Sequence, residues 1–299
     1  MRCISVLLLL AACEQDRPAP PAPPPAPSPD PVVLASSEVP AFAVMAVAGA
    51  DVYWTEMSAE GRHDNTLWHQ RGTAPPTKRT VASWAIAADA TYVYYIGDNG
   101  HAFRQPHGAT DGEDIAPLAY PIWLALDGDT LFAVDSGTIL DKPHARLWKA
   151  APGAKPVALV DANAIAGLSI VGHRLYFARD NAVIESVDEA GKDEQILDPH
   201  PARVYVDAKV AYLGWTDGLA RVRLPGGVPE PLLQGTPIFP AGGDAKYVYA
   251  WVGDNAVAID KATLAQTTLA PGGLLQAIVG TDGLYLNQGK RIVRVPQPR

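Results

Sequence analysis

The fold of this chain can be inferred from one segment, Ile122-Trp123-Leu124-Ala125-Leu126-Asp127-Gly128-Asp129-Thr130-Leu131-Phe132-Ala133. It consists of a small, apolar segment, an Asp-Gly-Asp turn and a triplet with an aromatic residue at its centre. Asp and Gly tolerate the backbone angles of tight turns, so the stretch predicts two antiparallel β-strands. A third strand is expected at 145–149, and a fourth at 156–160 after the turn at Pro152-Gly153.

The apolar-aromatic-apolar triplet recurs along the chain, and its aromatic centres lie 36 to 44 residues apart. The seven centres are Tyr53, Tyr94, Phe132, Tyr176, Tyr212, Tyr249 and Tyr285. A period near forty, filled with short strands and turns and without helical periodicity, is typical of four-stranded blades repeated around an axis. The sequence therefore predicts an all-β fold, a single β-propeller of seven four-stranded blades.

The two ends of the repeat region complement each other. The seventh repeat stops after its third strand, Arg291-Ile292-Val293-Arg294-Val295, and Pro31-Val32-Val33-Leu34-Ala35 resembles the missing outer strand. Pairing of these N- and C-terminal strands would close the ring and cover two open sheet edges. The predicted propeller spans 31–299; six or eight blades remain the alternative if one weak repeat, such as that at Tyr212, is misread.

The repeat resembles exported bacterial propeller proteins of the TolB-like and NHL-like kind, including those grouped with virginiamycin B lyase. The resemblance rests on phrases of the form Asp-x-x-x-Val-Tyr-Trp and covers the chain after residue 30. It implies a fold, and its motifs assign no function. Neither the Trp-Asp signature of WD repeats nor a regular kelch Gly-Gly doublet is present.

The N-terminus resembles the signal of a bacterial lipoprotein. Arg2 precedes an apolar run, and Leu10-Ala11-Ala12-Cys13 matches a lipobox, in which the cysteine is lipidated and the chain is cut just before it. Only Cys3 and Cys13 occur, so the mature chain would keep one sulfur and no internal disulfide. We expect a signal peptide at 1–12 and a lipid such as palmitate on Cys13 that binds the bilayer. The alternative is an ordinary signal peptide with an incidental Cys13.

A proline-rich tether is expected to follow at 13–30. Proline lacks an amide hydrogen and fixes φ, so this stretch favours polyproline II, with a ligand for a proline-recognition domain as the alternative. Glu14, rather than an aspartate, follows Cys13. In some bacteria an aspartate at this position keeps a lipoprotein in the inner membrane. The resemblance to a lipoprotein therefore implies a place in the outer membrane, facing the periplasm.

Charge excludes one class of partner. The formal net charge is −8, with 24 Lys and Arg against 32 Asp and Glu, which argues against a nucleic-acid binder. No standard catalytic motif occurs, and no two histidines have the spacing of a local metal pair. We therefore predict no cofactor, no metal and no catalytic residue, and a monomeric chain.

Acidic or amide residues recur in the turns between second and third strands. They are Glu56, Asp98-Asn99, Asp135, Asp180-Asn181, Asp217-Gly218, Asp254-Asn255 and Asn287. They are interpreted as residues that tight turns require, with an acidic ring for a cationic ligand as the alternative.

Two of these turns, at 56–65 and 135–144, are longer than the closure of a hairpin needs. If one face binds a partner, we expect its centre there, at Glu56, His63, Asp64, Asp135, Asp141 and His144. Trp84 and Trp123 are expected to pack between blades, with aromatic contact on that face as the alternative.

Two functions compete at this point. The first is a non-enzymatic binding or scaffold module, tethered to the cell envelope, that presents one propeller face to an envelope protein or a cationic ligand. The second, which the family resemblance implies, is a metal-dependent lyase or hydrolase. Convergence of two or more His, Glu or Asp side chains at the channel mouth would favour the enzyme.

Overall fold

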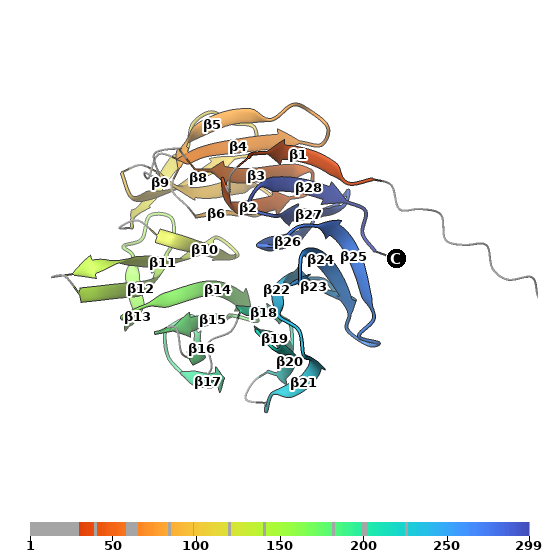
Figure 1. Cartoon of the computed structure of the whole chain (residues 1–299). Helices are drawn as coiled ribbons and strands as arrows, with labels where there is room; N and C mark the ends of the chain where they lie inside the picture. Colours follow the sequence, from red (N-terminus) through yellow and green to blue (C-terminus); the bar gives the residue numbers. More distant parts are fainter. Residues whose placement is uncertain are drawn as a thin grey trace, which may run out of the picture.

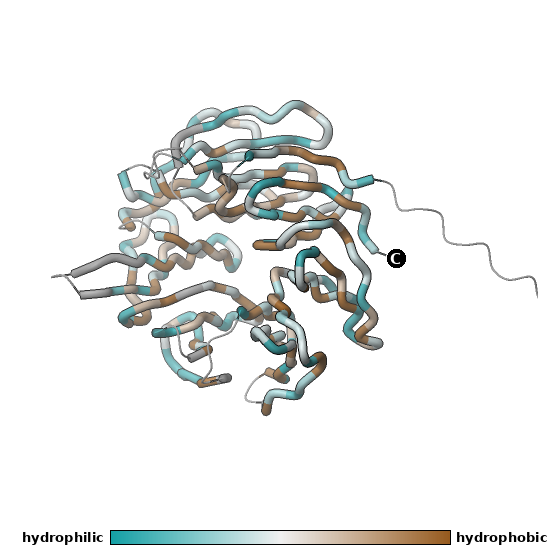
Figure 2. Tube along the Cα trace, viewed as in Figure 1, coloured by the Kyte–Doolittle hydropathy of each residue, from teal (hydrophilic) through white to brown (hydrophobic). Residues whose placement is uncertain are grey.

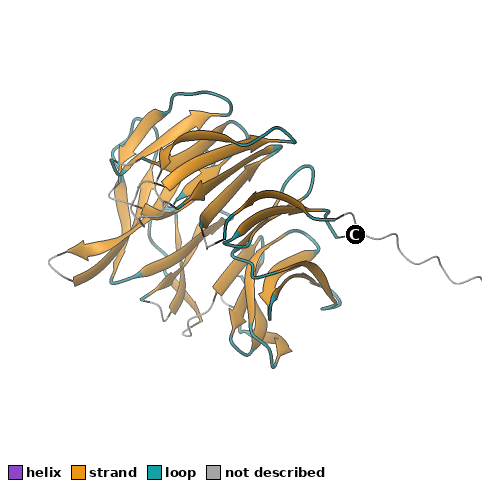
Figure 3. Cartoon of the chain, turned by 45° about the horizontal axis from the view of Figure 1, so that its top comes forward, coloured by secondary structure: helices purple, strands orange, loops and turns teal. Residues whose placement is uncertain are grey.

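The computed structural model describes residues 30–38, 41–57, 65–82, 85–97, 99–118, 121–139, 142–180, 183–198, 203–224 and 227–298. Over these ranges the chain is built of β-strands and connecting turns (Figure 3). No helix that could cross a membrane occurs among them. Cys13 and the expected tether lie outside the described residues.

The strands form seven four-stranded antiparallel sheets, or blades, arranged in a ring (Figure 1). Blade 1 consists of β2 (Phe42–Ala48), β3 (Asp51–Glu56), β4 (Asn65–Arg71) and β5 (Thr77–Ala82). Blade 2 consists of β6 (Ile86–Ala88), β7 (Tyr92–Ile96), β8 (His101–Pro106) and β9 (Glu113–Pro117). Blade 3 consists of β10 (Pro121–Asp127), β11 (Thr130–Ile139), β12 (Lys142–Ala150) and β13 (Val157–Ala162).

The remaining blades repeat this order. Blade 4 consists of β14 (Ile165–Val171), β15 (Arg174–Arg179), β16 (Val183–Asp188) and β17 (Gln195–Asp198). Blade 5 consists of β18 (Arg203–Asp207), β19 (Val210–Trp215), β20 (Gly218–Arg223) and β21 (Glu230–Gln234). Blade 6 consists of β22 (Ile238–Gly243), β23 (Tyr247–Val252), β24 (Asn255–Asp260) and β25 (Gln266–Pro271). Blade 7 consists of β26 (Gln276–Val279), β27 (Leu284–Asn287), β28 (Arg291–Val295) and β1 (Val32–Ser36).

The terminal strands close the ring, as predicted. β1 pairs antiparallel with β28, with Val33 opposite Val293 and Ser36 opposite Arg291. Beyond the ladder, the Ser37 amide donates to the Lys290 carbonyl at 2.9 Å. The prediction of a seven-bladed propeller is therefore confirmed, and β1 covers an edge that would otherwise be open.

The core consists of apolar layers between neighbouring blades (Figure 2). Within the described ranges, a cluster of buried residues lies at each of the seven interfaces. The triplets explain this arrangement. In blade 3, Phe132 packs toward blade 4, whereas Leu131 and Ala133 pack toward blade 2. Successive side chains of a strand point to opposite faces, so a strand with both faces buried needs a continuous apolar run.

The aspartate that precedes several triplets also has a structural role. Asp89 Oδ1 accepts hydrogen bonds from the Thr91 and Tyr92 amides, and its Oδ2 accepts one from the Tyr94 hydroxyl. Asp244 receives the Tyr249 hydroxyl in the same way, and Asp282 that of Tyr285. One side chain therefore closes the turn and provides the partner that a buried tyrosine hydroxyl needs.

The antiparallel order gives the ring two distinct ends. We call the end where innermost strands begin, and where turns between second and third strands lie, the start face. The far face is the end where innermost strands stop and turn into second strands.

One local expectation is wrong. Residues 135–144 do not form an extended loop, because β11 and β12 continue as a long hairpin with Asp135 opposite Arg146 and Ile139 opposite Lys142. Strand pairing absorbs the extra residues, since it satisfies backbone groups that a loop would leave to solvent.

Candidate functional site: an axial cavity on the start face

A cavity of about 470 Å³ lies on the propeller axis. Its walls come mainly from the first halves of the innermost strands, which places its mouth on the start face. Ala43 and Val44 of blade 1, Trp123 of blade 3 and Leu168 of blade 4 lie on one side. The other lining residues include Arg203, Tyr205, Pro240, Leu275 and Gln276.

β-Bulges shape this wall. The pairing of β2 with β3 skips Ala43 and Val44, and that of β14 with β15 skips Gly167 and Leu168. Ile122 and Ala241 are skipped in the same way in blades 3 and 6. All six residues line the cavity or its rim. Bulges turn the chain away from the regular ladder, and they are frequent beside binding sites.

Gly167 is the residue on which one of these bulges depends. Its φ of +67° lies in the left-handed region, which a side chain disfavours. Glycine at this point of β14 therefore lets the strand bend into the cavity wall.

The rim of the cavity is an apolar pocket of about 540 Å³. Phe42 and Met57 contribute to it from blade 1, Ile122 and Trp123 from blade 3, and Leu275 from the start of blade 7. Trp123 is 39% exposed and Leu275 is 41% exposed, although both are large and apolar. Contiguous exposed apolar surface around a concave mouth is typical of a binding site.

Trp123 therefore differs from the default expectation of packing between blades. It faces the mouth and fits the alternative of aromatic contact on this face. Trp84 lies outside the described residues.

Arg203 carries the charge of the cavity. It is the only ionisable side chain other than Tyr205 among the described lining residues. Its Nη1 donates to the Leu274 carbonyl at 3.3 Å, and its guanidinium carbon lies 6.0 Å from the centre of the Phe239 ring. Arg203 is exposed, and although partial desolvation lowers the pKa of its side chain, a guanidinium stays protonated in proteins.

The described residues of the set predicted from the long turns, Glu56, Asp135 and His144, do not line this cavity. Glu56 accepts a hydrogen bond from Trp68 Nε1 at 2.7 Å, and Asp135 accepts one from Trp148 Nε1 at 2.6 Å. Both acids lie on the second strand of their blade and accept a hydrogen bond from a tryptophan of the third strand. Burial raises the pKa of Asp135. His63, Asp64 and Asp141 lie outside the described residues.

His144 also lies away from the cavity. Its Nε2 is 3.5 Å from Asp161 Oδ1, which Arg146 Nε contacts at 2.6 Å. The described part of the predicted set thus has its contacts within blades 1 and 3, where Glu56 and Asp135 accept hydrogen bonds and His144 lies beside Asp161.

Blade 1 contains a buried pair that resembles a catalytic dyad. His69 Nε2 lies 2.7 Å from Asp51 Oδ1, and Arg79 Nη2 donates to His69 Nδ1 at 2.7 Å. The arginine therefore leaves the proton of the neutral ring on Nε2, where it is donated to Asp51. Desolvation lowers the pKa of His69. Both ring nitrogens are engaged within blade 1 and the side chain is buried outside the axial cavity, so the pair connects the second, third and fourth strands of that blade.

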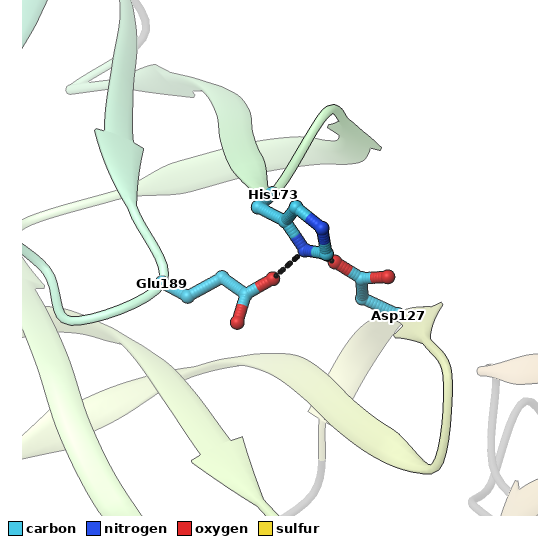
Figure 4. Close-up of side chains that lie close together, drawn as sticks. All are labelled: Asp127, His173 and Glu189. Atoms are coloured by element: carbon cyan, nitrogen blue, oxygen red, sulfur yellow. Dashed lines mark hydrogen bonds and ion pairs between the residues drawn. The ribbon is translucent and has the colours of Figure 1, made fainter.

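A second polar cluster lies on the far face (Figure 4). His173 Nδ1 lies 2.6 Å from Asp127 Oδ2 and 2.8 Å from Glu189 Oε1. Hydrogen bonds to Glu189 and Asp127 raise the pKa of His173, and hydrogen bonds to Glu189 and His173 lower the pKa of Asp127. Lys149 Nζ is 3.5 Å from Glu189 Oε2. The cluster therefore connects blade 3 to blade 4 through opposite charges.

Local geometry positions His173. It follows Gly172 in the two-residue turn between β14 and β15, with φ values of +56° for Gly172 and +60° for His173. Two positive φ angles are typical of a type I′ hairpin turn. The donor atoms of Asp127, His173 and Glu189 all lie within 4.8 Å of one another, so they could hold a divalent cation. The raised histidine pKa and the lysine oppose this, because a ligating imidazole must be neutral.

Sequence reasoning missed Arg203, Phe42, Leu275 and the far-face cluster. The sequence contained one signal for Arg203. It is a charged residue at the first position of an innermost strand, where most of the other repeats have an apolar residue. The cluster gave none, because 46 residues separate Asp127 from His173.

Comparison of folds agrees with the propeller assignment. No protein-family model and no curated protein sequence matches the chain. Among solved structures, YCF48 bound to D1 peptide is similar, with a TM-score of 0.65, 12% identity, and coverage of 90% of this chain and 95% of that one.

Two further structures illustrate the range of functions on this fold. BamB from Moraxella catarrhalis has a TM-score of 0.54 at 14% identity, covering 85% of this chain and 82% of its own. An oligogalacturonate lyase in complex with manganese has a TM-score of 0.66 at 8% identity, covering 90% and 96%. At such identities the likeness shows the fold alone.

Proposed function

We propose that the propeller is a non-enzymatic binding module that holds a protein partner at the axial cavity of its start face. The observation that carries this proposal is the apolar mouth, where Trp123 and Leu275 remain exposed beside a cavity with no described Asp, Glu or His in its wall. Large apolar side chains around a pocket can anchor a partner by burial. The likeness to propellers such as BamB and YCF48, the latter solved with a peptide, fits a binding or scaffold role.

Site-specific photo-crosslinking tests the choice of face. A benzophenone amino acid replaces Trp123 on the start face or Asp129 in the far-face turn of the same blade, and cell-envelope extract supplies the partner. We expect a discrete protein adduct from position 123, which Leu275→Glu in the same chain abolishes, and none from position 129. An adduct from position 129 alone would reject the start face.

We also propose that Cys13 is lipidated, that the proline-rich stretch tethers the propeller, and that the protein faces the periplasm from the outer membrane. The lipobox-like tetrad and the single sulfur left after cleavage support this. Labelling with an alkynyl fatty acid should mark the wild-type protein and not Cys13→Ala, and the variant should leave the membrane fraction. Label that persists in Cys13→Ala would reject the proposal.

A metal-dependent lyase is the second candidate. Among the described residues, the cluster of Asp127, His173 and Glu189 is the observation in its favour. It lies on the far face, away from the axial cavity, so it does not meet the expectation of convergence at that mouth. Calorimetric titration with Mn²⁺ distinguishes the candidates: binding by the wild type that Asp127→Asn abolishes would favour the enzyme.

A further inference from the structure

Arg203 differs from most of the described arginines in having no carboxylate partner. Arg79 and Arg291 also donate to backbone carbonyls, but they do not line the cavity. Many described arginines form ion pairs with carboxylates of their own blade. These include Arg104 with Glu113, Arg146 with Asp161, Arg174 with Asp193, Arg179 with Glu185, Arg221 with Glu230 and Arg294 with Asp282. Arg203 has no such pair among the described residues; it contacts a carbonyl and an aromatic ring.

Arg203 is exposed at the start of β18 and lines the cavity, so its guanidinium is open to an anion that enters. A carboxylate can accept two parallel hydrogen bonds from one guanidinium, which makes it a well-matched anion for this side chain. The remaining lining residues are apolar or, like Ser169, Tyr205 and Gln276, polar and uncharged. The cavity is therefore electrostatically complementary to a single negative charge attached to an apolar group, and not to the cation that the acidic turns suggested.

The bulged strands add a second requirement. Because the ladder skips Ala43, Val44, Gly167, Leu168 and Ala241, the wall presents irregular backbone beside the polar side chains of Ser169 and Gln276. Gln276 Oε1 already accepts the Met45 amide at 2.8 Å. Backbone and amide groups in a wall suit a ligand with peptide groups better than a hydrocarbon chain, which cannot form hydrogen bonds with them.

We propose that the axial cavity binds the C-terminal end of a partner chain, with its terminal carboxylate on Arg203 and an apolar last side chain against Trp123 and Leu275. This inference rests on the proposed binding function and names the part of the partner that is recognised. Capture of a terminal carboxylate is a recurring mode of peptide recognition. The cavity volume of about 470 Å³ lies within the range of small-ligand pockets.

Paired peptides test the carboxylate. The probe is a pool of fluorescein-labelled pentapeptides that end in Leu, Ile, Phe or Trp, prepared once as free acids and once as amides, with binding measured by anisotropy. We expect the acids to bind about tenfold or more tightly than the amides, which corresponds to one charge-assisted interaction. Arg203→Gln should remove this preference by weakening the binding of the acids to about that of the amides.

Arg221→Gln is the matched control, because Arg221 belongs to the same blade and is paired with Glu230 outside the cavity. It should keep the full preference for acids. Thermal unfolding of each variant confirms that it is folded. Decanoate serves as a competitor that carries the same charge and an apolar chain without peptide groups, and it should displace the acids only weakly.

The outcomes separate this inference from the proposed function. Equal affinity of acids and amides, both weakened by Trp123→Ala, would overturn the carboxylate assignment and leave the binding face in place. Tight, Arg203-dependent binding of decanoate with no peptide binding would overturn the peptide assignment. Absence of peptide binding together with absence of a crosslink from position 123 would reject the binding face itself.

Discussion

The two faces of the ring differ in how their polar groups are satisfied. On the far face, the turn carboxylates of Asp89 and Asp244 accept hydrogen bonds from backbone amides and from tyrosine hydroxyls. His173 lies between two acidic side chains on the same face. On the start face, bulged strands surround an apolar mouth that holds an unneutralised Arg203. The described far-face carboxylates and His173 have partners on that face, whereas the start face has a charge and apolar surface that a ligand would cover. This contrast is the reason for assigning the binding role to the start face.

Both faces depend on a closed ring, so opening it should have the largest effect. Deletion of Val32–Ser36 removes β1 and exposes the edge of β28. We expect loss of the cooperative unfolding transition and aggregation, because an open edge strand templates pairing with other chains. Size-exclusion chromatography with circular dichroism measures this. A deleted chain that remains monomeric with an unchanged melting temperature would contradict closure through β1.

Leu274 and Leu275 provide a matched comparison, since they are adjacent and only one belongs to the mouth. Leu274 is fully buried and Leu275 is 41% exposed. We expect Leu274→Ala to lower the free energy of unfolding by about 2–5 kcal/mol and Leu275→Ala by about 1 kcal/mol. Urea unfolding checks the stability. Only Leu275→Ala should weaken peptide binding, and equal stability losses would show that Leu275 is a core residue.

Asp244 tests whether the far-face carboxylates are structural. Its side chain accepts the Lys246 and Tyr247 amides at 2.8 Å and the Tyr249 hydroxyl. Asp244→Ala should cost about 2–4 kcal/mol, because it leaves a buried hydroxyl and turn amides without their acceptor. Tyr249→Phe should cost about 1 kcal/mol, since the turn stays closed. Neither change should alter peptide affinity; a loss of binding in Asp244→Ala would extend the site to the far face.

The smallest expected effect is the pH dependence of the far-face cluster. The pKa of His173 is raised, so its stabilisation is present below an unfolded-state pKa of about 6.5 and lost as pH rises through the folded-state value. The pKa of Asp127 is lowered, so its contribution is present above about pH 3.9 and lost as pH falls through the folded-state value. The cluster should therefore stabilise most between these limits.

His173→Asn isolates this contribution, because asparagine tolerates the positive φ at this position. Urea midpoints should separate the variant from the wild type near pH 5.5 and coincide well above the raised pKa of His173. A constant difference across this range would mean that His173 acts through packing or backbone conformation rather than through charge.

The repeat made the fold predictable because the constraint is local. Each second strand is buried on both faces, which demands an apolar triplet, and each turn into it favours Asp or Gly. Both signals can be recognised within a single repeat, from the one centred on Tyr53 to the one centred on Tyr285. Closure of the ring could also be predicted, since the segment Pro31-Val32-Val33 resembles the outer strand that the last repeat lacks.

The candidate site was less predictable because it depends on register and on ring geometry. A bulge at Gly167 is a shift in pairing between two strands, and a glycine within β14 permits it without showing which residues the ladder skips. Arg203, Trp123 and Leu275 come from blades 5, 3 and 7 and meet only at the axis. The extra residues between Asp135 and His144 suggested a loop, since sequence length alone does not distinguish a loop from a longer hairpin.

Hydrogen–deuterium exchange with and without the acid-ended peptide identifies the face of the ring that binds it. We expect slower exchange at the starts of innermost strands, around Ala43-Val44, Gly167-Leu168 and Leu275-Gln276, with no change at the far-face turns Asp127-Gly128-Asp129 and Gly172-His173. Slower exchange at the far-face turns, with none at the starts of the innermost strands, would contradict it.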